Sequence, residues 1–152
     1  MERLDRNFAD FLRLLNSHGV EYLVIGGYAV GYHGFVRATG DLDIFVRVSP
    51  DNAASLVKVF GDFGFSTPEL KEDLFMEEGK IVRIGLPPIR IEVLNSISGI
   101  KFEDAYPKRI EEIIDGVRMP FIDLESLLLN KSASGRLKDL ADIEGLKKKQ
   151  KG

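Results

Sequence analysis

The chain contains no cysteine, only two histidines and no long apolar segment. The lack of cysteine excludes disulfide bonds and thiolate zinc sites, and with His18 and His33 alone we do not expect a histidine-rich metal site. No apolar run approaches the roughly 18 residues that cross a membrane, and the N-terminus lacks the core of a signal peptide. We therefore expect a cytoplasmic protein without a membrane partner.

A strong charge of either sign is also lacking. A net charge of -3 over 152 residues gives no global attraction to nucleic acid, so a nucleic-acid substrate would need a local basic patch. This length can bury one sizeable core but not two independent ones. No internal repeat or linker interrupts the chain, and we predict a single domain over residues 1–152.

The most informative stretch begins with a short apolar run, Tyr22–Ile25, that ends in Gly26 and Gly27 and continues into helix-compatible residues. This pattern is typical of a buried strand that turns sharply into a helix. Glycines in such a turn let a phosphate approach the backbone closely, and the positive end of the helix favours the anion. The turn is therefore a candidate phosphate site.

An acidic strand follows Gly27 after thirteen residues. Residues two apart in a strand share a face, so Asp41 and Asp43 project together while Leu42 and Ile44 point into the core. Two adjacent carboxylates raise each other's proton affinity unless a cation lies between them. Hard divalent metals such as magnesium take oxygen ligands of this kind and share them with substrate phosphates.

The rest of the chain predicts further helices and strands. We expect a first helix that ends at Gly19, a helix from Ser49-Pro50 to Gly64, strands over 74–79, 81–86 and 89–94, a hairpin of 109–114 and 117–122, a helix from Asp123 to Lys131, and a final helix that turns Leu137, Leu140, Ile143 and Leu146 inward. This order predicts an α/β or α+β fold, with a mixed sheet covered by helices on at least one face and a short C-terminal helical segment.

The paired glycines and Asp41-Leu42-Asp43-Ile44 together resemble the signature of the DNA polymerase β-like nucleotidyltransferase superfamily, which joins a GG or GS turn to an acidic DxD strand. Gly34, Arg37, Thr39 and residues 131–142 resemble the small prokaryotic branch, which includes AbiEii-type toxins and minimal nucleotidyltransferases. The resemblance extends from about Tyr22 to Asp142.

The resemblance implies a metal-dependent transfer of a nucleoside monophosphate from a nucleoside triphosphate to a hydroxyl. It implies that Asp41, Asp43 and Glu92 form a catalytic triad that binds Mg²⁺ or Mn²⁺. The family more often has Asp at the third position, and because Glu is one methylene longer, a second metal would be held differently or not at all. The nucleotide-binding residues that it implies are Gly26, Gly27, Arg37, Thr39, Lys131, Arg136 and Lys138.

Simpler interpretations accompany these roles. Glu92 can pair with Arg90 or Arg83 on an exposed face, and Lys138 and Asp142 have the spacing of an ordinary pair on a helix surface. A non-catalytic module that binds a nucleotide or a partner protein, like an antitoxin, is the alternative function. The short chain favours a macromolecular acceptor, protein or RNA, over a small molecule. A cognate toxin or antitoxin and a homodimer are further candidate partners.

Overall fold

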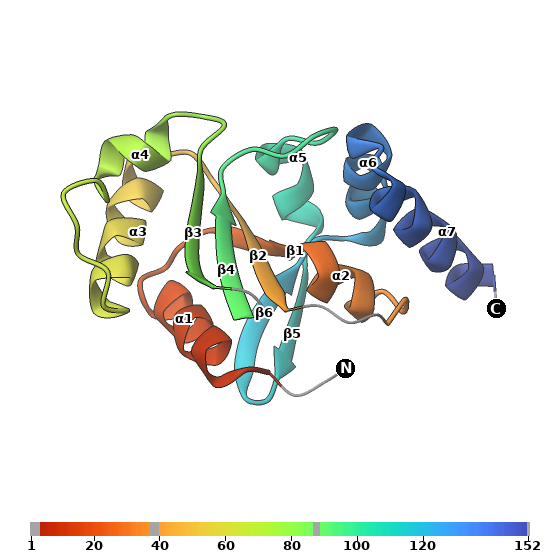
Figure 1. Ribbon diagram of the computed structural model, residues 1–152, viewed down its shortest axis with the longest axis horizontal. Helices are drawn as coiled ribbons and strands as arrows, with labels where there is room; N and C mark the ends of the chain where they lie inside the picture. The colour runs from red at the N-terminus through yellow and green to blue at the C-terminus, as the bar shows by residue number, and fades with distance from the viewer. Residues whose placement is uncertain (1–3, 37–39, 87–88, 152) are drawn as a thin grey trace.

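The computed structural model describes residues 4–36, 40–86 and 89–151 (Figure 1). In chain order the elements are α1 (Arg6–Ser17), β1 (Tyr22–Ile25), α2 (Gly26–Tyr32), β2 (Asp41–Val46), α3 (Pro50–Asp62), α4 (Glu72–Met76), β3 (Ile81–Leu86), β4 (Ile89–Leu94), α5 (Phe102–Ala105), the 3-10 helix η1 (Tyr106–Lys108), β5 (Ile110–Ile114), β6 (Val117–Phe121), α6 (Leu124–Ser134) and α7 (Leu137–Lys151). Within the described ranges, no helix has both the length and the apolar character that a membrane crossing requires.

The strands form one six-stranded sheet in the order β3-β4-β2-β1-β6-β5. β2 runs parallel to β4 and β1 runs parallel to β6, whereas the other neighbouring pairs are antiparallel. In Figure 1, α3 and α4 lie together at one end of the sheet, and α6 and α7 lie together at the other. The prediction of a mixed sheet covered by helices is confirmed.

The core forms where α1 and α3 pack together, as their apolar spacing predicts. Phe11 of α1 is fully buried and meets Phe60 of α3 edge-on, with 5.6 Å between ring centroids. Both helices begin with a side-chain cap: Asp5 accepts hydrogen bonds from backbone N–H groups of α1, and Ser49 does the same for α3. Gly19 follows α1 with a φ of 68°, which is the backbone expected of a glycine that ends a helix.

The predicted hairpin of β5 and β6 is confirmed. Asp115 and Gly116 join the strands with φ values of 51° and 78°. Positive φ at both central residues is the backbone of a type I′ turn, which matches the twist of the flanking strands. Ile114 and Val117 therefore pair directly across the hairpin.

Two predictions are wrong. Residues 74–79 do not form a strand, because α4 occupies Glu72–Met76. Acidic residues in its first turn suit a helix N-terminus, and Phe75 becomes buried by stacking on Phe60 at 5.7 Å. In α7, Leu137 and Leu140 do not turn inward: they are 88% and 50% exposed.

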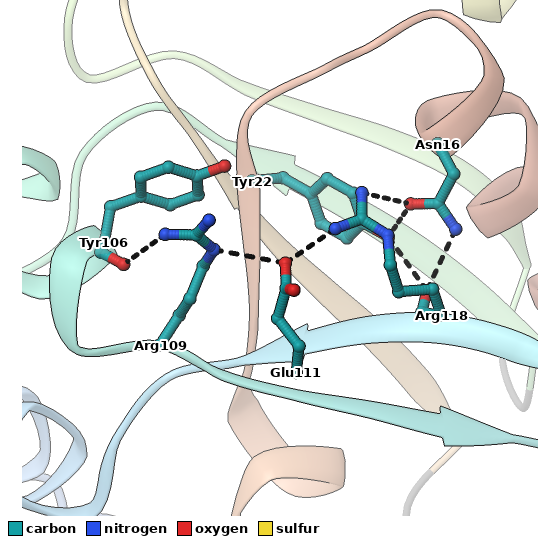
Figure 2. Close-up of polar contacts among 6 residues, drawn as sticks. All are labelled: Asn16, Tyr22, Tyr106, Arg109, Glu111 and Arg118. Carbon is teal, nitrogen blue, oxygen red and sulfur yellow. Dashed lines mark hydrogen bonds and ion pairs between the residues drawn. The ribbon is translucent and has the colours of Figure 1, made fainter.

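A polar network ties the start of β1 to α1 and to the hairpin of β5 and β6 (Figure 2). The buried Tyr22 hydroxyl donates to Asn16 Oδ1 at 2.7 Å, and Asn16 Nδ2 donates to the Arg118 carbonyl at 2.9 Å. Glu111 accepts from Arg118 at 2.6 Å and from Arg109 at 3.3 Å. We call these residues, with Tyr106, the Tyr22 network.

Candidate active site

The turn from β1 into α2 brings the backbone close to the acidic strand. All four residues of β1 are buried, and α2 begins at the next residue, Gly26, which has a φ of 66°. A Cβ atom built on Gly26 would overlap the Asp43 carboxylate. Glycine is therefore required here twice, for the positive φ and for the space that the Asp43 side chain fills. The group that closely approaches the Gly26 backbone is therefore the Asp43 carboxylate, and the approach of a phosphate stays a prediction.

Parallel pairing of β2 with β4 gathers the predicted carboxylates on one face. Asp43 lies opposite Glu92, and Asp41 lies opposite Arg90. Leu42 and Ile44, between and after the aspartates, are fully buried on the other face. Burial, and to a smaller extent the nearby carboxylates of Glu92 and Asp41, raise the pKa of Asp43 from 3.8 to about 6.

Two arginines occupy the space beside these carboxylates. An Nη2 atom of Arg90 lies 3.0 Å from Asp41 Oδ2 and 3.1 Å from Glu92 Oε1. Arg83 Nε of β3 lies 3.1 Å from the same Glu92 oxygen. Glu92 therefore forms ion pairs with both Arg83 and Arg90, as the simpler interpretation of this residue predicts, but its side chain is only 15% exposed. The strand register alone cannot reveal that Arg90 bridges two carboxylates, because this depends on its rotamer.

The aspartates fit a divalent cation. Oδ1 of Asp43 is buried and has no hydrogen-bond partner in the part of the chain that the structure describes, so a cation would satisfy a carboxylate oxygen that is otherwise costly to bury. Among the described residues, no three acidic or histidine side chains are grouped so that they could hold a metal ion. Oxygen atoms from substrate phosphates would therefore have to complete the coordination, as is usual for magnesium.

A buried ion cluster joins α6 to α7 beside the carboxylates. Lys131 Nζ lies 3.1 Å from Asp139 and 3.0 Å from Asp142, and all three side chains are at most 4% exposed. Arg136 Nε adds a contact of 2.7 Å to Asp139. Burial raises the pKa of Asp139, but hydrogen bonds from Arg136 and Lys131 outweigh this effect and lower it. Asp142 thus pairs with Lys131 inside the fold.

One cavity of about 650 Å³ collects most of the predicted site. Its lining includes Gly26, Gly27, Asp41, Asp43, Glu92, Lys131, Arg136 and Lys138, together with Arg83 and Arg90, which sequence reasoning considered only as partners of Glu92. The positive charges of Lys138 and Lys131 lower the pKa of Asp43, against the larger effect of burial. Acidic groups therefore lie at the centre of the cavity, with cations on two sides.

Two of the predicted nucleotide-binding residues, Arg37 and Thr39, lie outside the described residues.

A larger cavity of about 810 Å³ lies between α1, the end of α3 and the hairpin of β3 and β4. It is lined by Ile89 and Ile91, which alternate along β4 with Arg90 and Glu92, so it opens on the opposite face of the sheet from the carboxylates.

Comparisons with known proteins agree with this geometry. A family model described as "Nucleotidyltransferase of unknown function (DUF6036)" matches residues 2–147. No curated protein matches the chain.

Several solved structures share the fold. The lincomycin-bound lincosamide antibiotic adenylyltransferase LnuA has a TM-score of 0.56 at 18% identity, with 97% of this chain and 98% of that chain covered. The antibiotic-resistance factor ANT(2'')-Ia has a TM-score of 0.59 at 10% identity, with 92% and 80% covered. An antigenic nucleotidyltransferase-like protein from Paracoccidioides brasiliensis has a TM-score of 0.54 at 17% identity, with 91% and 73% covered. At these identities the likeness shows the fold alone.

Proposed function

Since this chain belongs to the family of nucleotidyltransferases of unknown function (DUF6036), we propose that it moves a nucleoside monophosphate from a nucleoside triphosphate to an acceptor hydroxyl at the Asp41, Asp43 and Glu92 site. The observation that carries the proposal is the register of β2 with β4, which sets Asp43 opposite Glu92. Asp43 lies beside the Gly26 turn, and its buried Oδ1 atom has no hydrogen-bond partner among the described residues.

Asp41 and Asp43 are the residues that would hold Mg²⁺ or Mn²⁺. Bound there, the ion would neutralise charge on the triphosphate and on the departing pyrophosphate. Gly26 and Gly27 begin α2, and their backbone would lie against phosphate oxygens, although the Asp43 side chain already fills the space beside the Gly26 Cα atom.

Cations on the α6 and α7 side of the cavity would contact the triphosphate. Arg136 is 67% exposed at its side chain and Lys138 is also exposed, so both can reach a phosphate from the cavity mouth. Lys131 is fixed by Asp139 and Asp142 and would contribute its charge from the cavity wall. Arg37 and Thr39 remain predicted nucleotide-binding residues.

In the reaction, the acceptor oxygen forms a bond to the α-phosphorus. The bond from this phosphorus to the oxygen that bridges to the β-phosphorus breaks, and pyrophosphate leaves with the electron pair. The hydroxyl proton passes to the carboxylate of Glu92, which the ion pairs with Arg83 and Arg90 keep in one orientation. Asp41 and Asp43 do not take this proton while they hold the cation.

For the acceptor, we propose a hydroxyl of a macromolecule, protein or RNA. Arg83 supports an anionic acceptor such as RNA, because its side chain is 56% exposed next to Glu92. The length of the chain no longer argues against a small molecule, since the matched region covers 98% of a lincosamide adenylyltransferase. Small molecules are therefore one arm of the test.

A toxin–antitoxin role belongs to the same proposal and predicts that expression of the wild-type chain, but not of an inactive variant, arrests growth.

The experiment is incubation of the chain with each labelled triphosphate, magnesium and either a cell lysate or a set of small hydroxyl compounds, followed by identification of the labelled product. Glu92→Gln should abolish labelling while triphosphate binding is nearly unchanged, and Glu92→Asp should keep activity. Triphosphate binding without labelling of any acceptor, in the wild-type chain, would favour the non-catalytic binding module instead.

A further inference from the structure

Arg90 lies between two carboxylates of the proposed site, Asp41 and Glu92. It lies opposite Asp41 in the strand register and two residues before Glu92 on the same face of β4. Its Nη2 atom is within 3.1 Å of both carboxylates. The guanidinium therefore already supplies a positive charge on the Glu92 side of the site, opposite the Gly26 turn.

Two buried atoms of this cluster have no hydrogen-bond partner within the described ranges, and they need ligands of opposite sign. Asp43 Oδ1 can only accept, so it calls for a cation, and Arg90 Nε can only donate, so it calls for an anion. One metal ion on Asp43 that carries a triphosphate oxygen towards Arg90 would satisfy both atoms.

Charge repulsion also acts against a second ion. Arg90 pairs with Asp41 and Glu92, and Arg83 pairs with Glu92, so the space between these two carboxylates already holds a positive charge. A second divalent ion between Asp41 and Glu92 would have to share this small space with a guanidinium, and like charges at such separations repel strongly in a partly buried site. Arginine keeps its charge throughout the physiological pH range, so the repulsion cannot be removed by deprotonation.

We propose that Arg90 takes the place of the second divalent cation, so that the chain binds one metal ion per nucleotide, at Asp41 and Asp43. This inference rests on the function proposed above. Arg90 then has two tasks: it holds Glu92 in position for the acceptor, and its Nε donates to a phosphate oxygen of the bound triphosphate.

The test counts manganese ions by electron paramagnetic resonance in the presence of a non-hydrolysable triphosphate. Two Mn²⁺ ions at the roughly 3.5–4 Å spacing of a two-metal site are magnetically coupled, whereas an isolated ion gives a six-line spectrum. For the wild-type chain we expect one ion per protein and the spectrum of an isolated ion. For Arg90→Gln we expect a second, coupled ion, because the space and the Glu92 carboxylate become available.

Matched variants separate charge from shape. Arg90→Lys keeps a cation beside Asp41 and Glu92 and should still bind one ion. Arg83→Gln removes the other arginine from Glu92 but leaves Arg90 in place, and it should also bind one ion. Two coupled ions in the wild-type chain would overturn the inference while the proposed function survives, and so would a single ion in Arg90→Gln. Failure of the wild-type chain to bind any ion would contradict both.

Discussion

The two ends of β1 lie in different polar surroundings. The strand begins at Tyr22, in a network whose polar groups form hydrogen bonds with one another (Figure 2). It ends beside Gly26, near buried polar atoms that have no hydrogen-bond partner among the described residues. Both clusters contain carboxylates paired with arginines. In the Tyr22 network, Glu111 accepts from two arginines and Tyr22 bonds to Asn16. At the other end, a buried oxygen of Asp43 and a buried nitrogen of Arg90 lack partners among the described residues.

This difference predicts that the Tyr22 network serves stability and that the Asp43 site serves function. A completed hydrogen bond contributes to folding, whereas a buried polar atom without a partner costs free energy that some ligand must recover. Substitutions should therefore separate the two ends of β1: those at Tyr22 should lower stability without changing transfer, and those at Asp43 should abolish transfer without lowering stability.

Asp43→Asn should give the largest effect. The change preserves shape but removes the charge that would hold the metal, so we expect nucleotidyl transfer to fall by several orders of magnitude, at about 1.4 kcal/mol per factor of ten. A labelling assay beside a thermal unfolding curve measures both properties. A large fall in melting temperature together with lost activity would mean that Asp43 is a structural carboxylate.

Lys131→Met should give the largest loss of stability. Asp139 and Asp142 would remain buried without their counter-charge, and breaking a buried ion pair in this way costs about 3–5 kcal/mol. Urea unfolding measures the change. Arg136→Gln is the matched control, because it removes a mostly exposed cation from the same Asp139 and should cost less than about 1 kcal/mol. Equal costs for the two variants would contradict the buried cluster.

The raised pKa of Asp43 should make stability fall with rising pH. Its pKa is about 6 in the fold, compared with 3.8 for an ordinary aspartate, so the fold favours the protonated acid. This penalty is absent below pH 3.8, develops as pH rises towards 6, and is complete above it, with a size of about 3 kcal/mol. Without divalent ions, Asp43→Asn should therefore become more stable than the wild-type chain above pH 6, measured by unfolding at each pH. An unchanged difference between pH 4 and pH 8 would rule this out.

Tyr22→Phe should give the smallest effect. It removes the hydrogen bond to Asn16 while the ring stays packed, and a net loss of about 1 kcal/mol is expected. The free energy of unfolding and the transfer rate should be measured together. If the transfer rate falls by more than the loss of folded protein accounts for, the contrast between the two ends of β1 is contradicted.

Much of this arrangement could be predicted because it depends on local rules. The Gly26 turn, the Asp115-Gly116 hairpin and the alternation along β2 and β4 follow from backbone conformations and strand periodicity. These rules also placed Glu92 on the polar face of its strand. The parallel pairing of β2 with β4 then placed Asp43 opposite Glu92 and brought the three carboxylates to the lining of one cavity.

The errors arose where distant residues decide. The apolar pattern of α7 predicted that Leu137 and Leu140 face the core, yet the helix turns Asp139 and Asp142 inward. Burying one leucine contributes about 1.5–3 kcal/mol, and leaving Lys131 buried without its carboxylates would cost about 3–5 kcal/mol, so the two effects are of similar size. Which face of α7 turns inward therefore depends on Lys131 of another helix, and a single-helix pattern does not contain it.

The most direct test of the central claim is calorimetry of a non-hydrolysable triphosphate, with and without magnesium, on the wild-type chain and on Asp43→Asn. If Asp41 and Asp43 bind the phosphates through a divalent ion, the wild-type chain should bind tightly only with magnesium, because the carboxylates otherwise repel the phosphates. Asp43→Asn should lose most of the magnesium dependence. Equal affinity of the wild-type chain in magnesium and in chelator would contradict the account.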